Sequence, residues 1–91
     1  MNYNSIGKIA AAHGVNGELV VKHALGKKTS LKGLQTLFIE TRKGEFLPYF
    51  VQTSRMKNES EVFLQLEGVA TREQAQKLVS KDVWLTEEDF G

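Results

Sequence analysis

Cysteine is absent from the 91-residue chain, and proline occurs only once. The lack of cysteine excludes disulfides and thiolate-bound metals. No basic segment followed by an apolar one stands at the N-terminus, so we expect no signal peptide. No apolar run is long enough to cross a bilayer. A chain of this length forms one domain with a single modest core. We therefore expect a soluble cytoplasmic domain without a membrane partner.

A net charge of +1 conceals an uneven distribution of charge along the chain. Residues 1–57 contain nine basic and three acidic side chains, whereas residues 58–91 contain three basic and eight acidic ones. Segregation of this kind can form one basic face that docks on RNA or on an acidic partner. It can equally reflect solvated loops that happen to differ in charge.

Most of the chain has the composition and alternation of β-strands. We predict strands over 3–12, 18–24, 35–41, 46–52, 62–66 and 82–86. The sequence Arg42-Lys43-Gly44 is a short hairpin connection between the third and fourth strands. Pro48 restricts the fourth strand to an edge or a bulge, because proline cannot donate a hydrogen bond to a sheet.

One short helix is expected before the last strand. Thr71 is a candidate N-cap, and Gln74 three residues later completes a capping-box pattern. Ala75, Leu78 and Val79 then fall at positions i, i+3 and i+4, which forms one buried stripe. The whole pattern predicts an all-β fold, a small six-stranded antiparallel barrel with one short helix.

The aromatic side chains are expected to pack in this barrel rather than to stack on bases, because they alternate within predicted strands. This expectation covers Phe38, Phe46, Tyr49, Phe50, Phe63 and Trp84. Tyr3 is the exception, since it lies near the end of the chain.

The connection between the first two predicted strands is a candidate contact loop. Gly14 and Gly17 can adopt backbone angles that side chains forbid, and they let another molecule approach the main chain closely. His13 stands at the entrance of the turn, where it could be a general base, a metal ligand, an RNA-stacking residue or a side chain that fixes the turn. The other histidine, His23, has no carboxylate-rich pattern around it, and neither has His13. We favour the turn-fixing or contact role, because catalysis and metal binding lack their usual companions.

Basic residues in loops and strands are the remaining candidates for contact with RNA phosphates, although loop lysines are commonly just solvated. The full set of candidate partner-contact or RNA-contact residues is Lys8, His13, Gly14, Asn16, Gly17, Lys22, Lys27, Lys28, Arg42 and Lys43. We predict no catalytic residue, no metal ligand and no cofactor.

Two separated motifs resemble the bacterial ribosome maturation factor RimM family. The first is Ile-Gly-Lys-Ile at 6–9 followed by His-Gly-x-x-Gly-Glu at 13–18. The second is Leu-Glu-Gly-Val-Ala-Thr-Arg-Glu-Gln-Ala at 66–75, followed by Asp-Val-Trp-Leu at 82–85. The two motifs stand in the order expected for the family and span nearly the whole chain. A lone Gly-x-x-Gly turn would be a weak signal.

The resemblance implies a fold and a function. It implies a Greek-key-like barrel related to those of translation elongation factors over residues 1–86, with residues 87–91 beginning a linker to a missing C-terminal PRC-type barrel. Members of the family are non-enzymatic assembly factors that bind the small ribosomal subunit and assist maturation of its head and of 16S rRNA. Their contact with a head-domain ribosomal protein is ascribed mainly to the second domain. We expect a monomer.

The chain departs from the family at Asn16, where members often carry a basic residue. Positive charge near the turn would then come from Lys8, Lys22 and the Lys27-Lys28 pair. A generic RNA-binding barrel outside ribosome assembly is the alternative function. A small-barrel enzyme or flavin-binding domain is the third, and no nucleophile–base pair, phosphate-cradling loop or carboxylate pair supports it.

Overall fold

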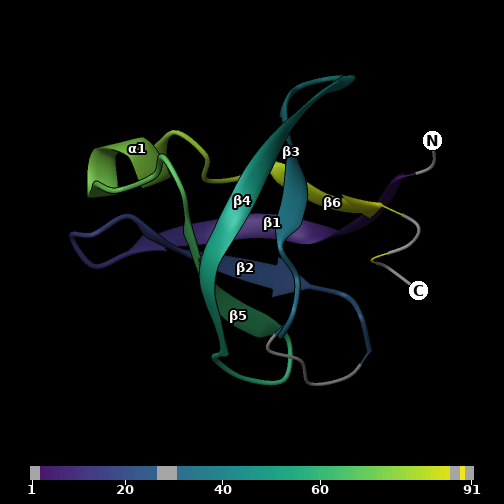
Figure 1. The fold of residues 1–91 in the computed structure, drawn as a ribbon, viewed down its shortest axis with the longest axis horizontal. Coiled ribbons are helices and arrows are strands. Elements are labelled where there is room, and N and C mark those ends of the chain that lie inside the picture. The colour runs from purple at the N-terminus through teal and green to yellow at the C-terminus, as the bar shows by residue number, and fades with distance from the viewer. Residues whose placement is uncertain (1–2, 27–30, 87–88, 90–91) are drawn as a thin grey trace.

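The structure is a computed structural model that describes residues 3–26, 31–86 and 89 (Figure 1). Six strands and one helix follow one another along the chain. They are β1 (Tyr3–His13), β2 (Glu18–His23), β3 (Thr36–Arg42), β4 (Glu45–Met56), β5 (Glu61–Leu66), α1 (Arg72–Gln76) and β6 (Asp82–Thr86). Within the described ranges no helix has the length and apolar character needed to span a membrane.

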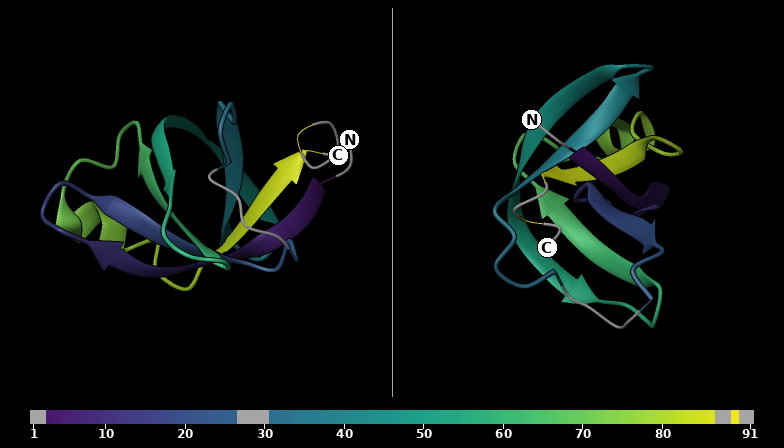
Figure 2. Two further views of the ribbon diagram at one scale, coloured as in Figure 1. Left: turned by 90° about the horizontal axis from the view of Figure 1, so that it is seen from below. Right: turned by 90° about the vertical axis from the view of Figure 1, so that its right-hand side faces the viewer.

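The strands form a closed antiparallel ring in the order β1-β2-β5-β4-β3-β6. Consecutive hairpins join β3, β4 and β5, and β6 returns to lie beside β3, which is the Greek-key arrangement. Figures 1 and 2 show that α1 lies at the end of the ring where β1 turns into β2. The predicted six-stranded barrel with one short helix is confirmed.

The interior is filled by aliphatic side chains. Buried positions alternate along the strands, so that Leu37 and Ile39 of β3 and Val83 and Leu85 of β6 point inward. The main members of the core are Ile6, Ile9, Leu19, Val21, Leu37, Ile39, Val62, Leu64, Leu66, Val69, Ala75, Leu78, Val83 and Leu85. Small barrels leave room inside only for side chains of this size.

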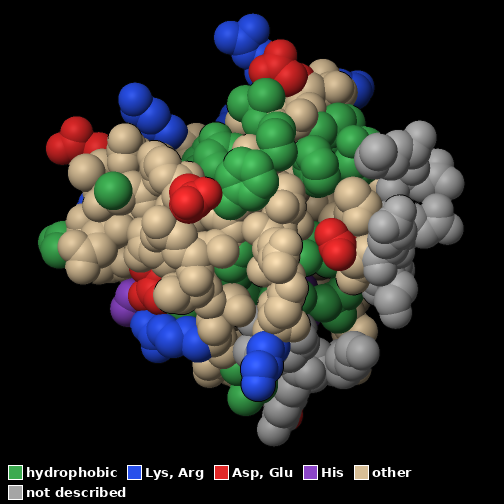
Figure 3. Space-filling view, viewed as in Figure 1, with side chains coloured by type: hydrophobic (Ala, Val, Ile, Leu, Met, Phe, Trp, Pro, Cys, Tyr) green, Lys and Arg blue, Asp and Glu red, His purple; other side chains and the backbone are tan. Residues whose placement is uncertain are grey.

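Of the aromatic residues expected to pack in the barrel, only Tyr49 packs against the core in the described part of the chain. The inward positions are taken by aliphatic residues, so strand alternation turns their aromatic neighbours outward. Four aromatic rings form a cluster on the outer face of β1, β3, β4 and β6. Tyr3 packs on Phe38 at 4.9 Å and on Phe46 at 5.4 Å, and Phe46 packs on Trp84 at 5.2 Å, between ring centroids. In the view of Figure 3, hydrophobic side chains gather over β3 and β4.

Two local predictions agree with the structure, and among the strand boundaries the end of β4 differs most. The hydroxyl of Thr71 accepts from the backbone N–H of Gln74 at 3.1 Å, and the Gln74 side chain accepts from the N–H of Thr71 at 3.2 Å, which completes the capping box. Pro48 lies in the half of β4 that pairs with β3, before the pairing with β5 begins at Val51. We expected β4 to end at residue 52, but it continues to Met56 because β5 pairs with its polar second half.

Candidate functional site

The two glycines of the β1–β2 turn have different roles. Both have positive φ, 71° at Gly14 and 81° at Gly17. A Cβ on Gly14 would meet no other atom within 4 Å, whereas a Cβ on Gly17 would lie 2.6 Å from the carbonyl oxygen of Val69. Gly17 therefore lets the turn pack on the segment that leads into α1, and it is buried. Of the two, only Gly14 is open to an outside partner.

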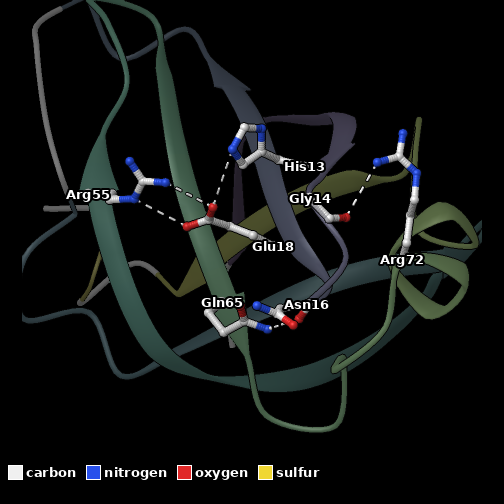
Figure 4. A network of polar contacts seen from close by, with 7 residues as sticks. All are labelled: His13, Gly14, Asn16, Glu18, Arg55, Gln65 and Arg72. Atoms are coloured by element: carbon white, nitrogen blue, oxygen red, sulfur yellow. Dashed lines mark hydrogen bonds and ion pairs between the residues drawn. The ribbon is translucent and has the colours of Figure 1, made fainter.

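Side chains of the domain itself hold the carbonyl groups of this turn (Figure 4). Gln65 of β5 donates through Nε2 to the carbonyls of Asn16 and Val69, each at 2.8 Å. Arg72 in the first turn of α1 donates to the carbonyl of Gly14 at 3.4 Å. Because Gln65 and Arg72 lie 49 and 58 residues further along the chain, the turn is fixed by tertiary contacts.

His13 contacts the outer face of the barrel beside this turn. Its ring lies 4.7 Å from the ring of Phe63, and its Nε2 lies 3.9 Å from Glu18 Oε1. Arg55 contacts the same two residues, because its guanidinium lies 4.0 Å from the centroid of Phe63 and donates to both carboxylate oxygens of Glu18, at 3.0 and 3.3 Å. These contacts hold His13 against β5 and Glu18, and its turn-fixing or contact role stays a prediction.

Figure 4 shows the imidazole of His13 beside the carboxylate of Glu18. Among the described residues, no group of three or more His, Asp and Glu side chains is placed to hold a metal ion. His23 is the last residue of β2. Its side chain is buried, and burial lowers its pKa from the ordinary value of 6.5. The two histidines therefore share no site.

The predicted basic candidates fall into separate groups. Lys8 and Lys22 are partners across β1 and β2, and Lys8 Nζ lies 4.0 Å from Asp82. Arg42 and Lys43 stand at the tip of the β3–β4 hairpin, which Figure 1 shows well away from the β1–β2 turn. Lys27 and Lys28 lie outside the described residues.

The order of the strands in the ring places strands from the acidic half of the sequence, residues 58–91, beside strands from the basic half, residues 1–57. β5 and β6 come from the acidic half and lie between strands of the basic half. Ion pairs join the halves at Lys8–Asp82, at 4.0 Å, and at Lys57–Glu61, at 3.1 Å. In the described part of the chain, positive charge is divided into local groups, and the hypothesis of one basic face has no support there.

A cleft of about 280 Å³ lies beside the β3–β4 hairpin. It joins the predicted pair Arg42 and Lys43 to a third cation, Lys81, which the sequence reasoning missed. The lining residues are Glu40, Thr41, Arg42, Lys43, Ser80, Lys81 and Asp82. Nothing local in the sequence indicated this proximity, because it depends on the pairing of β6 with β3. The sequence reasoning also missed Arg55. A hairpin between β4 and β5 places Arg55 opposite Phe63, so predicting that hairpin would have identified it.

Residues 5–90 match the family model described as the RimM N-terminal domain. The chain belongs to the RimM N-terminal domain family. Over 76 residues it is 34% identical to the ribosome maturation factor RimM of Oleidesulfovibrio alaskensis, a match that covers 84% of this chain and 42% of that protein.

Two solved RimM structures share this fold. The chain superposes with a TM-score of 0.77 and 20% identity on RimM of Pseudomonas aeruginosa, described as a 16S ribosomal RNA processing protein, covering 96% of this chain and 52% of that one. The N-terminal domain of RimM from Thermus thermophilus, solved in solution, gives a TM-score of 0.75 at 21% identity, covering 100% of this chain and 96% of that one. The chain spans about half the length of the longer RimM relatives.

Proposed function

We propose that this chain is a non-enzymatic ribosome assembly domain that binds the immature small subunit and assists maturation of the subunit head and of 16S rRNA. The observation that carries the proposal is the family match over residues 5–90. A relative 34% identical over 76 residues is named as a ribosome maturation factor, which supports the same function.

The mechanism is selective binding. A protein without a reacting group changes an RNA folding equilibrium only by binding one conformation more tightly than another. A rigid barrel suits this task, because its contact groups are positioned before binding and little conformational entropy is lost. The β1–β2 turn is one such group, since Gln65 and Arg72 hold it from the barrel side.

The partners follow from the same proposal. The domain contacts 16S rRNA in the cytoplasm as a monomer, and residues 1–86 are its barrel domain. Residues 87–91 begin a linker to a PRC-type barrel, and that second domain makes the main contact with a head-domain ribosomal protein. The length of the longer relatives, about twice that of this chain, supports a second domain.

Co-sedimentation tests the proposed function. The 91-residue chain is mixed with immature small subunits, with mature small subunits and with an unrelated structured RNA, at several salt concentrations. We expect retention on immature subunits and weaker retention on the other two. Equal retention on all three would instead support a generic RNA-binding module outside ribosome assembly. Absence of binding to every partner would refute both functions for this chain.

A further inference from the structure

We propose that the cleft between the β3–β4 hairpin and the turn before β6 binds a phosphodiester group of RNA. The proposal deepens the function above, because the RNA partner comes from that function. It assigns the interaction to one cleft, lined on its two sides by the hairpin residues Arg42 and Lys43 and by Ser80 and Lys81.

The cations of the cleft are available to a ligand. Arg42 and Lys43 are exposed and Lys81 is half-buried. Within the described ranges, none of these three side chains forms an ion pair or a hydrogen bond. Arg55 and Lys57 differ from them, since both are bound to carboxylates. Three unpaired cations that line one cleft provide the positive charge that a phosphate requires.

Both carboxylates that line the cleft already have partners within the domain. Glu40 accepts from the backbone N–H of Gly44 at 2.8 Å and from the indole N–H of Trp84 at 3.2 Å, one bond at each oxygen. Asp82 lies 4.0 Å from Lys8 Nζ. The negative charge at the wall is therefore partly compensated, whereas the three cationic groups are not.

The wall that carries Lys81 is positioned before any ligand binds. The N–H of Ser80 donates to the carbonyl of Ile9 at 2.7 Å, and the N–H of Ile9 donates to the carbonyl of Lys81 at 2.9 Å. Ser80 has φ of 76°, a conformation that costs energy for a residue with a side chain. Its hydroxyl has no hydrogen-bond partner among the described residues and can donate to a phosphate oxygen.

The size of the cleft favours part of an RNA backbone over an enclosed small molecule. Its volume of about 280 Å³ lies below the usual range of roughly 300–1,000 Å³ for ligand pockets. A phosphodiester with its adjoining sugars crosses such a cleft without being enclosed by it. Lysine and arginine contacts to phosphate also position an RNA without reading its sequence, as selection by shape requires.

The first test removes the cleft cations and compares a matched control. The cleft variant is Arg42→Gln, Lys43→Gln and Lys81→Gln together, and the control is Lys32→Gln, Lys57→Gln and Lys77→Gln, which removes equal charge from residues that do not line the cleft. Both are measured against immature small subunits and protein-free 16S rRNA as a function of KCl concentration. We expect the cleft variant to flatten the salt dependence of log Kd by about one unit for each phosphate that it no longer neutralises. Its affinity near 0.1 M salt should fall by roughly tenfold or more.

Each outcome decides between named possibilities. Equal losses in the cleft and control variants would place the attraction in the overall charge and overturn the cleft assignment. Unchanged binding of the cleft variant, with intact binding by the parent, would overturn the cleft assignment alone. Failure to bind subunits together with full binding to 16S rRNA would assign the cleft to an acidic protein and also overturn it. No binding by the parent chain to either probe would refute this proposal and the proposed function together. Circular dichroism confirms that each variant is folded.

For a second variant, the proposal predicts tighter binding to RNA. Asp82→Asn removes a negative charge from the cleft wall and releases Lys8, so we expect binding to 16S rRNA to become several-fold tighter. Glu67→Gln is the control, because it removes one exposed negative charge from a residue that does not line the cleft. Equal or weaker binding by the Asp82→Asn variant would contradict the proposal, and this result cannot arise from misfolding if thermal unfolding is unchanged.

Discussion

The indole N–H of Trp84 on β6 donates to Glu40 on β3 across 3.2 Å. The other oxygen of the same carboxylate accepts from the backbone N–H of Gly44 in the hairpin turn. The side chain of Glu40 on β3 therefore connects β3 to both β6 and the β3–β4 turn by hydrogen bonds. Trp84 also packs edge-on against Phe46, so this carboxylate links the cleft to the outer aromatic cluster.

We expect Trp84→Phe and Glu40→Gln each to lower the free energy of unfolding by about 1 kcal/mol, since the first removes the partly buried hydrogen bond and the second replaces its charged acceptor by a neutral one. The two losses should not add, because both variants act on the same contact. Urea denaturation followed by circular dichroism measures the double-mutant cycle. A coupling free energy near zero would show that the contact contributes nothing to stability.

The sequence predicted those features of the fold that depend on neighbouring residues. The capping box of Thr71 and Gln74 and the alternation of Val62, Leu64 and Leu66 needed no knowledge of distant contacts. Alternation identifies two faces of a strand but not which face is inside. The aromatic residues were therefore expected in core or barrel packing without a choice of face, and the structure places the aliphatic face inside.

The candidate site was harder to predict, because its parts meet through the strand order. The sequence suggested Arg42 and Lys43, but their approach to Lys81 depends on the pairing of Glu40 with Asp82. Likewise, His13 was recognised as a residue of the turn, but its partner Phe63 lies 50 residues away on β5. Contacts across such separations are set by topology, and single-sequence periodicity does not specify topology.

Substitution at the two glycines of the β1–β2 turn should separate the stability cost of a close contact from the cost of a positive φ. Gly17→Ala places a Cβ 2.6 Å from the carbonyl oxygen of Val69 at a φ of 81°, so we expect a loss of roughly 2–4 kcal/mol in the free energy of unfolding. Gly14→Ala has a similar φ but meets no neighbour within 4 Å, and it should cost only about 1 kcal/mol. Chemical denaturation of both variants measures the difference. Equal losses would mean that the approach to Val69 is relieved by movement of the turn.

His13→Ala should lower stability by about 0.5–1 kcal/mol, because it removes a ring contact on the barrel surface. If the contact with Phe63 is responsible, His13→Ala in a Phe63→Leu background should cost measurably less. Binding to immature subunits, measured under conditions where both proteins are folded, tests the contact role separately. Weaker binding by folded His13→Ala protein would show that the imidazole contacts the partner as well as fixing the turn.

His23 should make the domain less stable below neutral pH. Its imidazole is buried, its Nδ1 accepts from the N–H of Leu25 at 3.4 Å, and its Nε2 has no partner in the described part of the chain. Burial lowers its pKa below 6.5, so the unfolded chain takes up a proton at a higher pH than the folded domain does. The stabilisation is therefore complete above 6.5 and is lost as the pH falls from that value towards the folded pKa.

The free energy of unfolding falls by about 1.4 kcal/mol for each unit that separates the pKa of His23 in the folded domain from its pKa in the unfolded chain. Urea denaturation between about pH 7.5 and 5.5 should show the decline in the parent chain and a smaller one in His23→Gln, which has no proton to take up. His13→Gln is the control, because its half-exposed imidazole lies at the other end of β2. The hydrogen bond from Asn58 lowers the pKa of Glu61 below 4.5, so that carboxylate titrates outside this range. A decline of the same size in the parent and His23→Gln would place the titrating group elsewhere.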